Sequence, residues 1–256
     1  YALIIILSGV RYVTGICFSI WSILFPEFLE WVVCSWDLYK RLRLNSDYYD
    51  LKRIFDFVFS LGLILFLSPL ITILVLIGLV IQGWPVFFYH RRLGLNCVPF
   101  IMVKFRTMTV GPSLSAKHDV SRLTSWGRLL RRFSLDELPV LYNVIRGQMS
   151  LVGPRPLPEK YGPRFNDYQN RRHEVRPGIT GLAQIKGRNL LSWEVKFDYD
   201  IHYVEHHNFL MDVKILFKTF LQVVKGEGVR AEKQEIMPEF MGSKQSENKG
   251  SSNKID

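Results

Sequence analysis

The chain has 256 residues, a formal net charge of +10 and a hydrophobic content of 48%. This length is enough for one domain with a full core. The positive charge indicates an anionic partner: nucleic acid, a membrane surface or a phosphorylated substrate. The high hydrophobic content favours the membrane among these. The cysteines show no metal-ligand or redox spacing, which excludes a disulfide framework and indicates a reducing compartment; they are Cys17, Cys34 and Cys97.

Residues 1–48 form an apolar N-terminal segment that we leave without a function. Within residues 2–25 the only charge is Arg11, which would be costly in lipid. Three interpretations stay open: a poor transmembrane helix, the tail of a larger membrane region, or sequence foreign to the domain. A signal peptide is disfavoured, because no basic start precedes the apolar run and no clear small-residue cleavage site follows it.

An uncharged stretch at 57–81 is long enough to span a bilayer. Ser68 and Pro69 lie near its middle, where proline removes a backbone donor and bends a helix. Both flanks are basic, which favours both ends on the cytoplasmic side. Residues 49–82 are therefore predicted to form a re-entrant helix that breaks at Ser68 and Pro69, dips into one leaflet and returns. A kinked spanning helix is the alternative. The flanking cations include Lys52, Arg53, Arg91 and Arg92.

Residues 83–240 are predicted to form a polar domain outside the membrane. A turn followed by a strand is expected at 83–89, and a second extended segment at 99–108. Alternation along this second segment places Lys104 and Arg106 on one face. A solvated strand face would explain these two cations equally well.

Helices are expected at 124–133, 138–145, 193–206 and 210–224. The helix at 210–224 is amphipathic and would lie on anionic lipid or against its own domain. His202 and His206 have the i, i+4 spacing of a metal pair, but no third ligand is evident, which favours a surface pair. The polar residues 241–256 are predicted to be a disordered tail.

Asp136 and Glu137 are the only acidic residues between Asp119 and Glu159. Two neighbouring carboxylates among guanidinium groups suit a site that holds a cation and handles a phosphate-rich anion. The arginines of the same stretch are Arg122, Arg128, Arg131, Arg132, Arg146 and Arg155.

The acidic pair also has a purely structural interpretation. Ser134 as N-cap and Glu137 three residues later would form a capping box. Pro139 disfavours it, because a proline at the fifth helical position clashes with the carbonyl four residues back. A later helix start would leave Asp136 and Glu137 just before the helix, with their charges facing its positive end. Spacing alone leaves the binding site and the cap open.

Three turns after the acidic pair combine glycine with arginine. At 153–156 the glycine allows a close backbone approach, and two prolines fix the loop that presents Arg155. Arg176 begins the second turn, at 176–181, and the third lies at 187–189. Backbone amides and guanidinium groups can both reach phosphate, so these turns are candidate phosphate-binding elements. None of them is a Walker loop or a dinucleotide fingerprint.

In this order the motifs resemble those of the bacterial sugar transferases, the polyprenyl-phosphate hexose-1-phosphate transferases. More closely, they resemble the small monotopic phosphoglycosyl transferases. The likeness extends from about residue 49 to about residue 240. It rests on Lys52-Arg53-Ile54-Phe55-Asp56, Ser68-Pro69, Lys104-Phe105-Arg106-Thr107-Met108, Ser134-Leu135-Asp136-Glu137-Leu138-Pro139, Met149-Ser150-Leu151-Val152-Gly153-Pro154-Arg155-Pro156, Pro177-Gly178-Ile179-Thr180-Gly181 and Gly187-Arg188-Asn189.

The resemblance implies an α/β, mostly helical, monotopic membrane protein, in which the re-entrant helix carries a small cytoplasmic catalytic domain with amphipathic surface helices. It implies transfer of a sugar-1-phosphate from a UDP-sugar to polyprenyl (undecaprenyl) phosphate with release of UMP. This would be the first membrane step of surface polysaccharide or glycoconjugate synthesis, at the cytoplasmic face of the bacterial inner membrane. The implied partners are the two substrates and anionic lipids, and not nucleic acid.

The resemblance also implies residue roles. Asp136 would attack the sugar-bearing phosphate and form a covalent intermediate. Glu137, with help from Asp136, would bind Mg²⁺, which offsets the charge of one anion attacking another. Arginines and lysines would steady the phosphates, with Arg155 the first candidate. The other phosphate-binding candidates are Arg131, Arg132, Arg176, Lys104 and Arg106.

The sequence departs from the family pattern at His90, Cys97 and Val140, where the family usually has glutamine, glycine and glutamine. None of these departures removes a proposed catalytic group. Two other hypotheses compete with the covalent route. In one, the lipid phosphate attacks directly and Asp136 only helps to hold metal. In the other, the chain is a basic, non-enzymatic scaffold that binds a membrane or nucleic acid, which would explain the net charge but not the isolated acidic pair or the turns that combine glycine with arginine.

Overall fold

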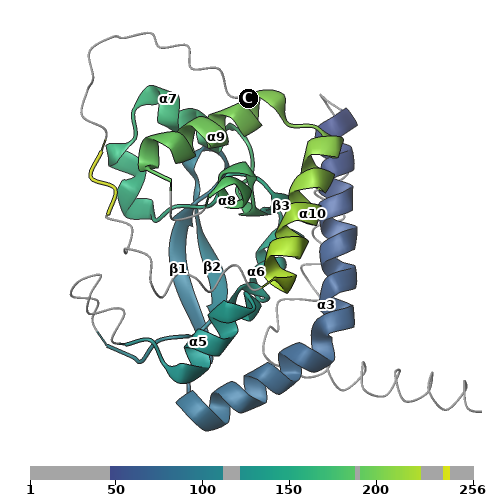
Figure 1. Cartoon of the computed structure of the whole chain (residues 1–256), viewed down its shortest axis with the longest axis vertical. Coiled ribbons are helices and arrows are strands. Elements are labelled where there is room, and N and C mark those ends of the chain that lie inside the picture. Colours follow the sequence, from purple (N-terminus) through teal and green to yellow (C-terminus); the bar gives the residue numbers. More distant parts are fainter. Residues whose placement is uncertain (1–46, 112–121, 188–190, 226–238, 243–256) are drawn as a thin grey trace, which may run out of the picture.

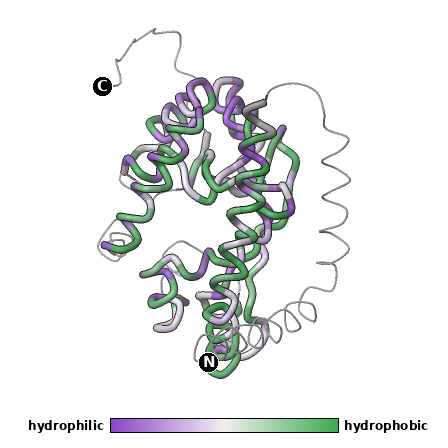
Figure 2. The backbone as a smooth tube through the Cα atoms, turned by 90° about the vertical axis from the view of Figure 1, so that its right-hand side faces the viewer, coloured by the Kyte–Doolittle hydropathy of each residue, from purple (hydrophilic) through white to green (hydrophobic). Residues whose placement is uncertain are grey.

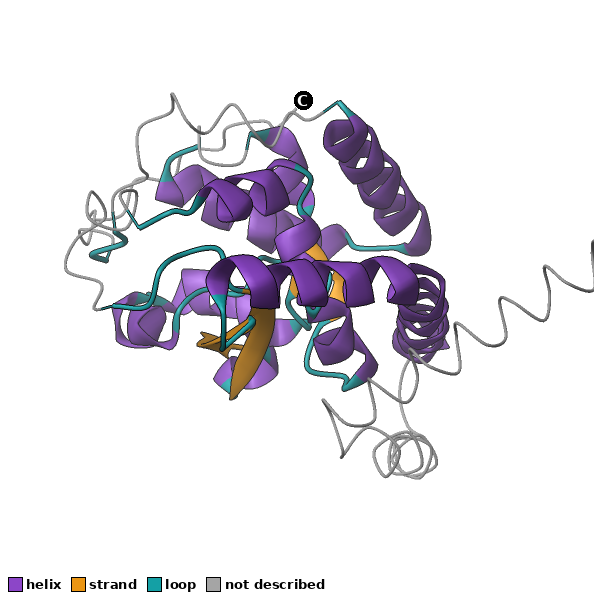
Figure 3. Ribbon diagram, turned by 90° about the horizontal axis from the view of Figure 1, so that it is seen from below, coloured by secondary structure: helices purple, strands orange, loops and turns teal. Residues whose placement is uncertain are grey.

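The computed structural model describes residues 47–111, 122–187, 191–225 and 239–242. The N-terminal segment up to residue 46, most of the turn at 187–189 and the tail beyond residue 242 lie outside the described residues. The described part is mostly helical and contains two small sheets of two strands each (Figure 1, Figure 3). The prediction of a mostly helical chain with short strands is confirmed.

The long apolar helix α3 (Asp47–Gln82) is continuous and bent, with Pro69 inside it (Figure 1). Pro69 has no N–H for the carbonyl of Leu65, and the hydroxyl of Ser68 donates to that carbonyl instead, at 2.8 Å. The predicted break therefore takes the form of a bend within one helix. By length and composition, Leu51–Gln82 is able to cross a membrane. Its placement in a bilayer stays a prediction.

The first sheet follows α3 directly. Strand β1 (Phe87–Leu93) pairs antiparallel with β2 (Pro99–Phe105), as the two extended segments predicted. The turn η1 (Leu95–Cys97) joins the strands. Cys97 has a φ of +59°, a left-handed conformation that favours glycine, so the cysteine at this position strains the backbone.

Helix α5 (Ser125–Arg132) packs directly on the end of β2. A Cβ added at Gly127 would lie 2.0 Å from the carbonyl oxygen of Thr107, so only glycine allows this approach. The 3₁₀ turn η2 (Leu135–Glu137) follows, and then the fully buried helix α6 (Val140–Ile145). Both helices were predicted from the sequence.

Strand β3 (Ser150–Val152) pairs parallel with β4 (Gly178–Thr180). The chain between them forms the short helices η3 (Glu159–Arg164), α7 (Asp167–Asn170) and η4 (Arg171–Glu174). A Cβ added at Gly153 would meet the carbonyl oxygen of Arg176 at 2.4 Å. This confirms the close backbone approach predicted for that glycine.

The last three helices among the described residues are α8 (Leu182–Lys186), α9 (Trp193–His206) and α10 (Phe209–Val224). The predicted helices at 193–206 and 210–224 are thereby confirmed. His202 and His206 stack with ring centroids 4.3 Å apart. Among the described residues, no group of three potential metal ligands includes them.

Helix α10 begins near the start of α3, and most residues of both helices are hydrophobic (Figure 1, Figure 2). Lys52 of α3 forms an ion pair with Asp212 of α10. Arg53 donates to the carbonyls of Val144 and Ile145 at 2.6 and 2.7 Å, at the end of α6. The two cations that the sequence indicated as a membrane flank thus bind the start of α3 to the domain.

Candidate active site

A cavity of about 830 Å³ opens between the first sheet, the turn η2 and helices α8 and α9. Its polar wall holds five of the predicted site residues: Lys104, Arg131, Asp136, Glu137 and Arg155. Its opposite wall is apolar and comes from α3 and α10, through Phe59, Leu63, Leu67, Leu216 and Val223. A polar substrate group and an apolar chain could therefore meet within one cavity.

The two carboxylates are presented by the acidic turn, which we define as residues 134–137. Ser134 has a φ of +54° and makes no side-chain cap hydrogen bond, so the capping-box interpretation is wrong. Pro139 serves as the N-cap of α6, where its missing N–H costs nothing. The later helix start is confirmed, and it leaves Asp136 and Glu137 in a 3₁₀ turn facing the cavity.

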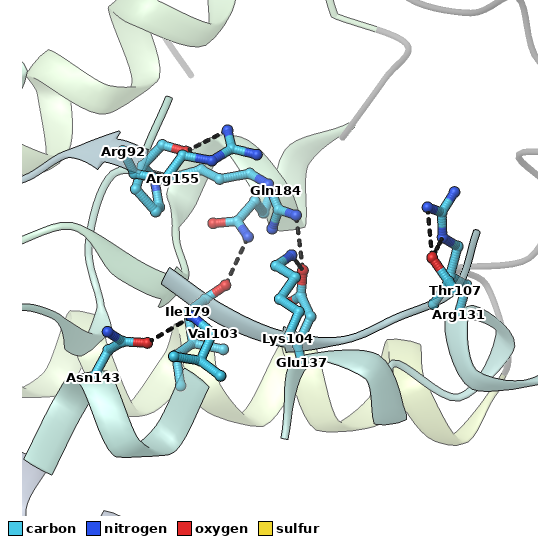
Figure 4. A network of polar contacts seen from close by, with 11 residues as sticks. Arg92, Val103, Lys104, Thr107, Arg131, Glu137, Asn143, Arg155, Ile179 and Gln184 are labelled. Carbon is cyan, nitrogen blue, oxygen red and sulfur yellow. Dashed lines mark hydrogen bonds and ion pairs between the residues drawn. The ribbon is translucent and has the colours of Figure 1, made fainter. Parts of the chain in front are cut away.

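Glu137 is held by two cations. Lys104 Nζ and Arg155 Nη2 both donate to Oε1 of Glu137, at 2.6 and 2.8 Å (Figure 4). Burial alone would raise the pKa of Glu137. The charges and hydrogen bonds of Arg155 and Lys104 outweigh burial and hold this pKa well below its usual range. Glu137 is therefore a permanent anion, and its Oε2 has no hydrogen bond to any described residue.

Asp136 has a different environment, although it is the neighbouring residue. It makes no hydrogen bond or ion pair within the described ranges of the chain. Burial, followed by the negative charge of Glu137, raises the pKa of Asp136. Neither of its oxygens is therefore engaged by another described residue.

The donor set fits a magnesium ion. Mg²⁺ takes oxygen ligands and is usually bound by one or two carboxylates, substrate phosphates and water. Asp136 and Oε2 of Glu137 supply oxygens of this kind in the cavity. The described residues contain no cluster of three His, Cys, Asp or Glu side chains, so a complete protein cage is not formed by them.

Arg155 lies on the basic turn, which we define as residues 154–157. All four carbonyls of this turn accept hydrogen bonds from elsewhere in the chain. Gly178 N donates to the first and Leu93 N to the last, at 2.9 and 3.1 Å. Arg172 donates to the carbonyl of Arg155 at 2.7 Å, and Arg92 to that of Pro156 at 3.2 Å. The backbone that carries Arg155 is therefore fixed from several sides.

Sequence reasoning missed the support behind the basic turn. Arg172 of η4 forms a buried ion pair with Asp200 of α9 at 2.7 Å, with side-chain exposures of 3% and 6%. Burial raises the pKa of Asp200 to about 6, and the positive charge of Arg172 opposes that rise. The guanidinium also lies over the rings of Phe165 and Phe197. No local pattern marks these residues, because they come from separate elements.

Four other predicted phosphate ligands have different surroundings. Arg131 lines the cavity but donates to the hydroxyl of Thr107, at 2.9 and 3.1 Å (Figure 4). The remaining three do not line the cavity. They are Arg106, which binds the carbonyls of Gln82 and Gly83 at the end of α3; Arg176, which donates to the carbonyl of Gly147; and Arg132, which lies over the Phe133 ring.

The sequence of the chain matches that of a known family and of several curated proteins. The model of the bacterial sugar transferase family matches residues 47–226. A protein named "Uncharacterized sugar transferase EpsL" from Bacillus subtilis is 45% identical over 195 residues, which are 75% of this chain and 96% of that protein. The exopolysaccharide production protein ExoY from Sinorhizobium fredii is 37% identical over 198 residues, which are 69% of this chain and 87% of that protein.

A third relative has a more explicit name. The UDP-glucose:undecaprenyl-phosphate glucose-1-phosphate transferase from Klebsiella pneumoniae is 37% identical over 190 residues. The match covers 69% of this chain and 40% of that longer protein.

Proposed function

Because the chain belongs to the bacterial sugar transferase family and is therefore a phosphoglycosyl transferase, we propose that it transfers a sugar-1-phosphate from a UDP-sugar to undecaprenyl phosphate and releases UMP. The names of relatives support the two substrates: one is a UDP-glucose transferase and another an undecaprenyl-phosphate galactose phosphotransferase. The exopolysaccharide relatives support a place at the start of surface polysaccharide or glycoconjugate synthesis.

The observation that carries this proposal is the contrast between Asp136 and Glu137 in one cavity. In the first step, an oxygen of Asp136 attacks the sugar-bearing phosphorus of the UDP-sugar. The bond from that phosphorus to the bridging oxygen breaks, and UMP leaves with the electron pair. In the second step, an oxygen of undecaprenyl phosphate attacks the same phosphorus. The bond to Asp136 breaks, the carboxylate is restored, and the lipid diphosphate sugar is released.

The surrounding charges suit this chemistry. Lys104 and Arg155 balance the charge of Glu137 and leave Asp136 without a cation on its own oxygens. The Arg155 guanidinium, carried on the fixed basic turn, is the main candidate for steadying the substrate phosphates. Mg²⁺ held by Glu137 and Asp136 would neutralise part of the phosphate charge. Lys104 acts through Glu137 and positions it.

Membrane attachment through α3 and α10 is part of the proposal. Both helices expose large apolar side chains; Phe66 and Val80 of α3 are 80% and 86% exposed, and Phe217 of α10 is 61% exposed. Such side chains are costly in water and suit the acyl region of a bilayer. In this arrangement α3 enters one leaflet of the bacterial inner membrane from the cytoplasmic side, and the bend at Ser68 and Pro69 returns it.

The test is UMP release from a panel of UDP-sugars, with Mg²⁺, undecaprenyl phosphate and the whole chain in detergent. We expect release with at least one sugar, dependent on the lipid, and its loss by at least about a thousandfold in Asp136→Asn. Asp167→Asn is a matched control, because Asp167 is exposed and lies outside the cavity. Full activity in Asp136→Asn, or no release from any UDP-sugar by folded protein, would contradict the proposal.

A further inference from the structure

A group of cations lies on the α9 side of the cavity, next to the basic turn. Arg92 of β1, Arg155 of the basic turn, and Arg172 and Lys196 all line this side, and Asp200 is the one carboxylate among the described lining residues there. Asp200 is already bound to Arg172, and Glu137 to Arg155. Positive charge is therefore in excess on this wall.

Arg92 shows that this wall contains a hydrogen-bond donor without an acceptor. Its Nη1 donates to the carbonyl of Pro156, but its Nε is buried and has no hydrogen-bond partner. A buried donor without an acceptor is unfavourable and is rare in native proteins. Arg92 lies beside Arg155 in the site (Figure 4). Arg92 lines the cavity, so an anion bound there would lie next to a guanidinium that has an unpaired donor.

Lys196 extends the same wall along α9. Its ammonium lies 5.1 Å from the centroid of the Trp193 ring, and the side chain lines the cavity. Burial and then the charge of Arg155 lower the pKa of Lys196 to about 8, and the pKa of Arg92 to about 10. The charge of Arg155 thus repels the charges of both Arg92 and Lys196, and a bound anion would relieve that repulsion.

We propose that Arg92, Arg155 and Lys196 bind the phosphate that leaves with UMP. This inference rests on the proposed function, because it assigns the part of the UDP-sugar that does not become attached to Asp136. Arg155 connects the two places: its side chain contacts Glu137, and Arg92 and Lys196 are its charged neighbours.

Charge development favours this arrangement. When the bond between the bridging oxygen and the attacked phosphorus breaks, the electron pair stays on the UMP phosphate, which gains one negative charge. Cations already gathered at that position stabilise the charge without rearranging. The neutral sugar gains no charge in this step, so it has no comparable need for such a wall.

The experiment is calorimetric titration of UMP, and separately of uridine, into the whole chain in detergent. Lys196→Met keeps the length of the side chain and removes its charge. Arg92→Lys keeps the charge and removes the buried Nε donor. Lys186→Met is the matched control, because Lys186 is exposed on α8 and does not line the cavity.

We expect Lys196→Met to weaken UMP binding about tenfold or more, and Arg92→Lys to weaken it several-fold. Uridine should bind all variants equally, and Lys186→Met should match the wild type for both ligands. If both cavity variants bind UMP as strongly as the wild type, the inference is overturned. The proposed function would still stand in that case, provided that the wild-type chain releases UMP from a UDP-sugar. A wild-type chain that neither bound UMP nor used any UDP-sugar would overturn both.

Discussion

The acidic and basic turns contact each other through Glu137 and Arg155, yet they are constrained in opposite ways. In the basic turn, every carbonyl from residue 154 to residue 157 accepts a hydrogen bond from a distant element. In the acidic turn, Ser134 has a left-handed backbone and Asp136 has no hydrogen bond or ion pair with any described residue. The basic turn carries the guanidinium of Arg155, which must be oriented toward the substrate phosphates. The acidic turn, whose backbone hydrogen bonds are local to residues 131–138, carries the group that we propose to react.

Asp136 and Glu137 show the same difference over a single residue. The charges of Lys104 and Arg155 outweigh burial and lower the pKa of Glu137, whereas burial and the Glu137 charge raise that of Asp136. Neighbouring carboxylates thus acquire separate roles from their surroundings. The predictions below test this contrast, beginning with the largest expected effect.

Removing the charge of Glu137 should have the largest effect among them. In Glu137→Gln, Lys104 and Arg155 lose the anion between them, and a bound cation loses a negative ligand. We expect UMP release to fall about a hundredfold and to require more Mg²⁺ for half-maximal rate. A Mg²⁺ titration of UMP release measures both. Glu159→Gln, which disrupts the exposed Arg91–Glu159 pair, should leave the rate of UMP release and its Mg²⁺ requirement unchanged.

Releasing the basic turn should have the next largest effect. Arg172→Met leaves Asp200 as a buried, uncompensated carboxylate and should destabilise the fold by about 3–5 kcal/mol. Replacing both residues, as Arg172→Met with Asp200→Leu, should restore most of the stability. The double variant still lacks the donor to the Arg155 carbonyl, and its UMP release should fall about tenfold through a higher KM for the UDP-sugar. Wild-type kinetics in a stable double variant would mean that the hydrogen bonds to the other three carbonyls are enough to hold the basic turn in place.

The affinity for UMP should depend on pH beside the basic turn. Lys196, which is near Arg155 and Asp200, has a pKa of about 8. Below this pH it is charged and attracts the phosphate; above it, the ammonium is neutral and the attraction is lost. UMP itself is already a dianion above about pH 7. Titrations between pH 7 and about pH 9 should therefore show the affinity for UMP falling through pH 8. If the affinity of Lys196→Met does not change over this range, the fall in the wild type is due to Lys196.

The backbone of the acidic turn should give the smallest effect. Because Ser134 has a φ of +54°, Ser134→Gly should leave stability unchanged or raise it by less than about 1 kcal/mol. Ser134→Val should lower it by about 1–2 kcal/mol, since a branched side chain disfavours this conformation. Thermal unfolding of the two variants measures the difference. Equal melting temperatures would show that the turn relaxes to another conformation.

Local chemistry in the sequence predicted much of the site. Pro139 disfavoured a helix that starts at Ser134 and favoured a later start, with Asp136 and Glu137 just before α6. Gly153 indicated the close approach of two backbone segments, and the prolines around Arg155 indicated a fixed turn. Each conclusion depends on steric limits that act within a few residues.

Partners that are distant in the sequence could not be predicted. Alternation placed Lys104 and Arg106 on one face of the extended segment at 99–108, but it did not reveal that Arg106, just beyond β2, binds the end of α3. The sequence also gave no sign that Arg172 pairs with Asp200, or that Arg176 contacts Gly147. An arginine in a polar segment has the same local signature whether it binds a carbonyl, a carboxylate or a substrate. Only the tertiary fold decides among them.

Incubation of the chain with its UDP-sugar and Mg²⁺ in the absence of lipid tests the central claim most directly. Intact-protein mass spectrometry then follows the protein while UMP is quantified. We predict one UMP released per protein molecule, a mass increase equal to the sugar phosphate, and loss of both in Asp136→Asn. Turnover that requires the lipid, with no UMP released and no adduct formed without it, would contradict the account and favour direct attack by the lipid phosphate.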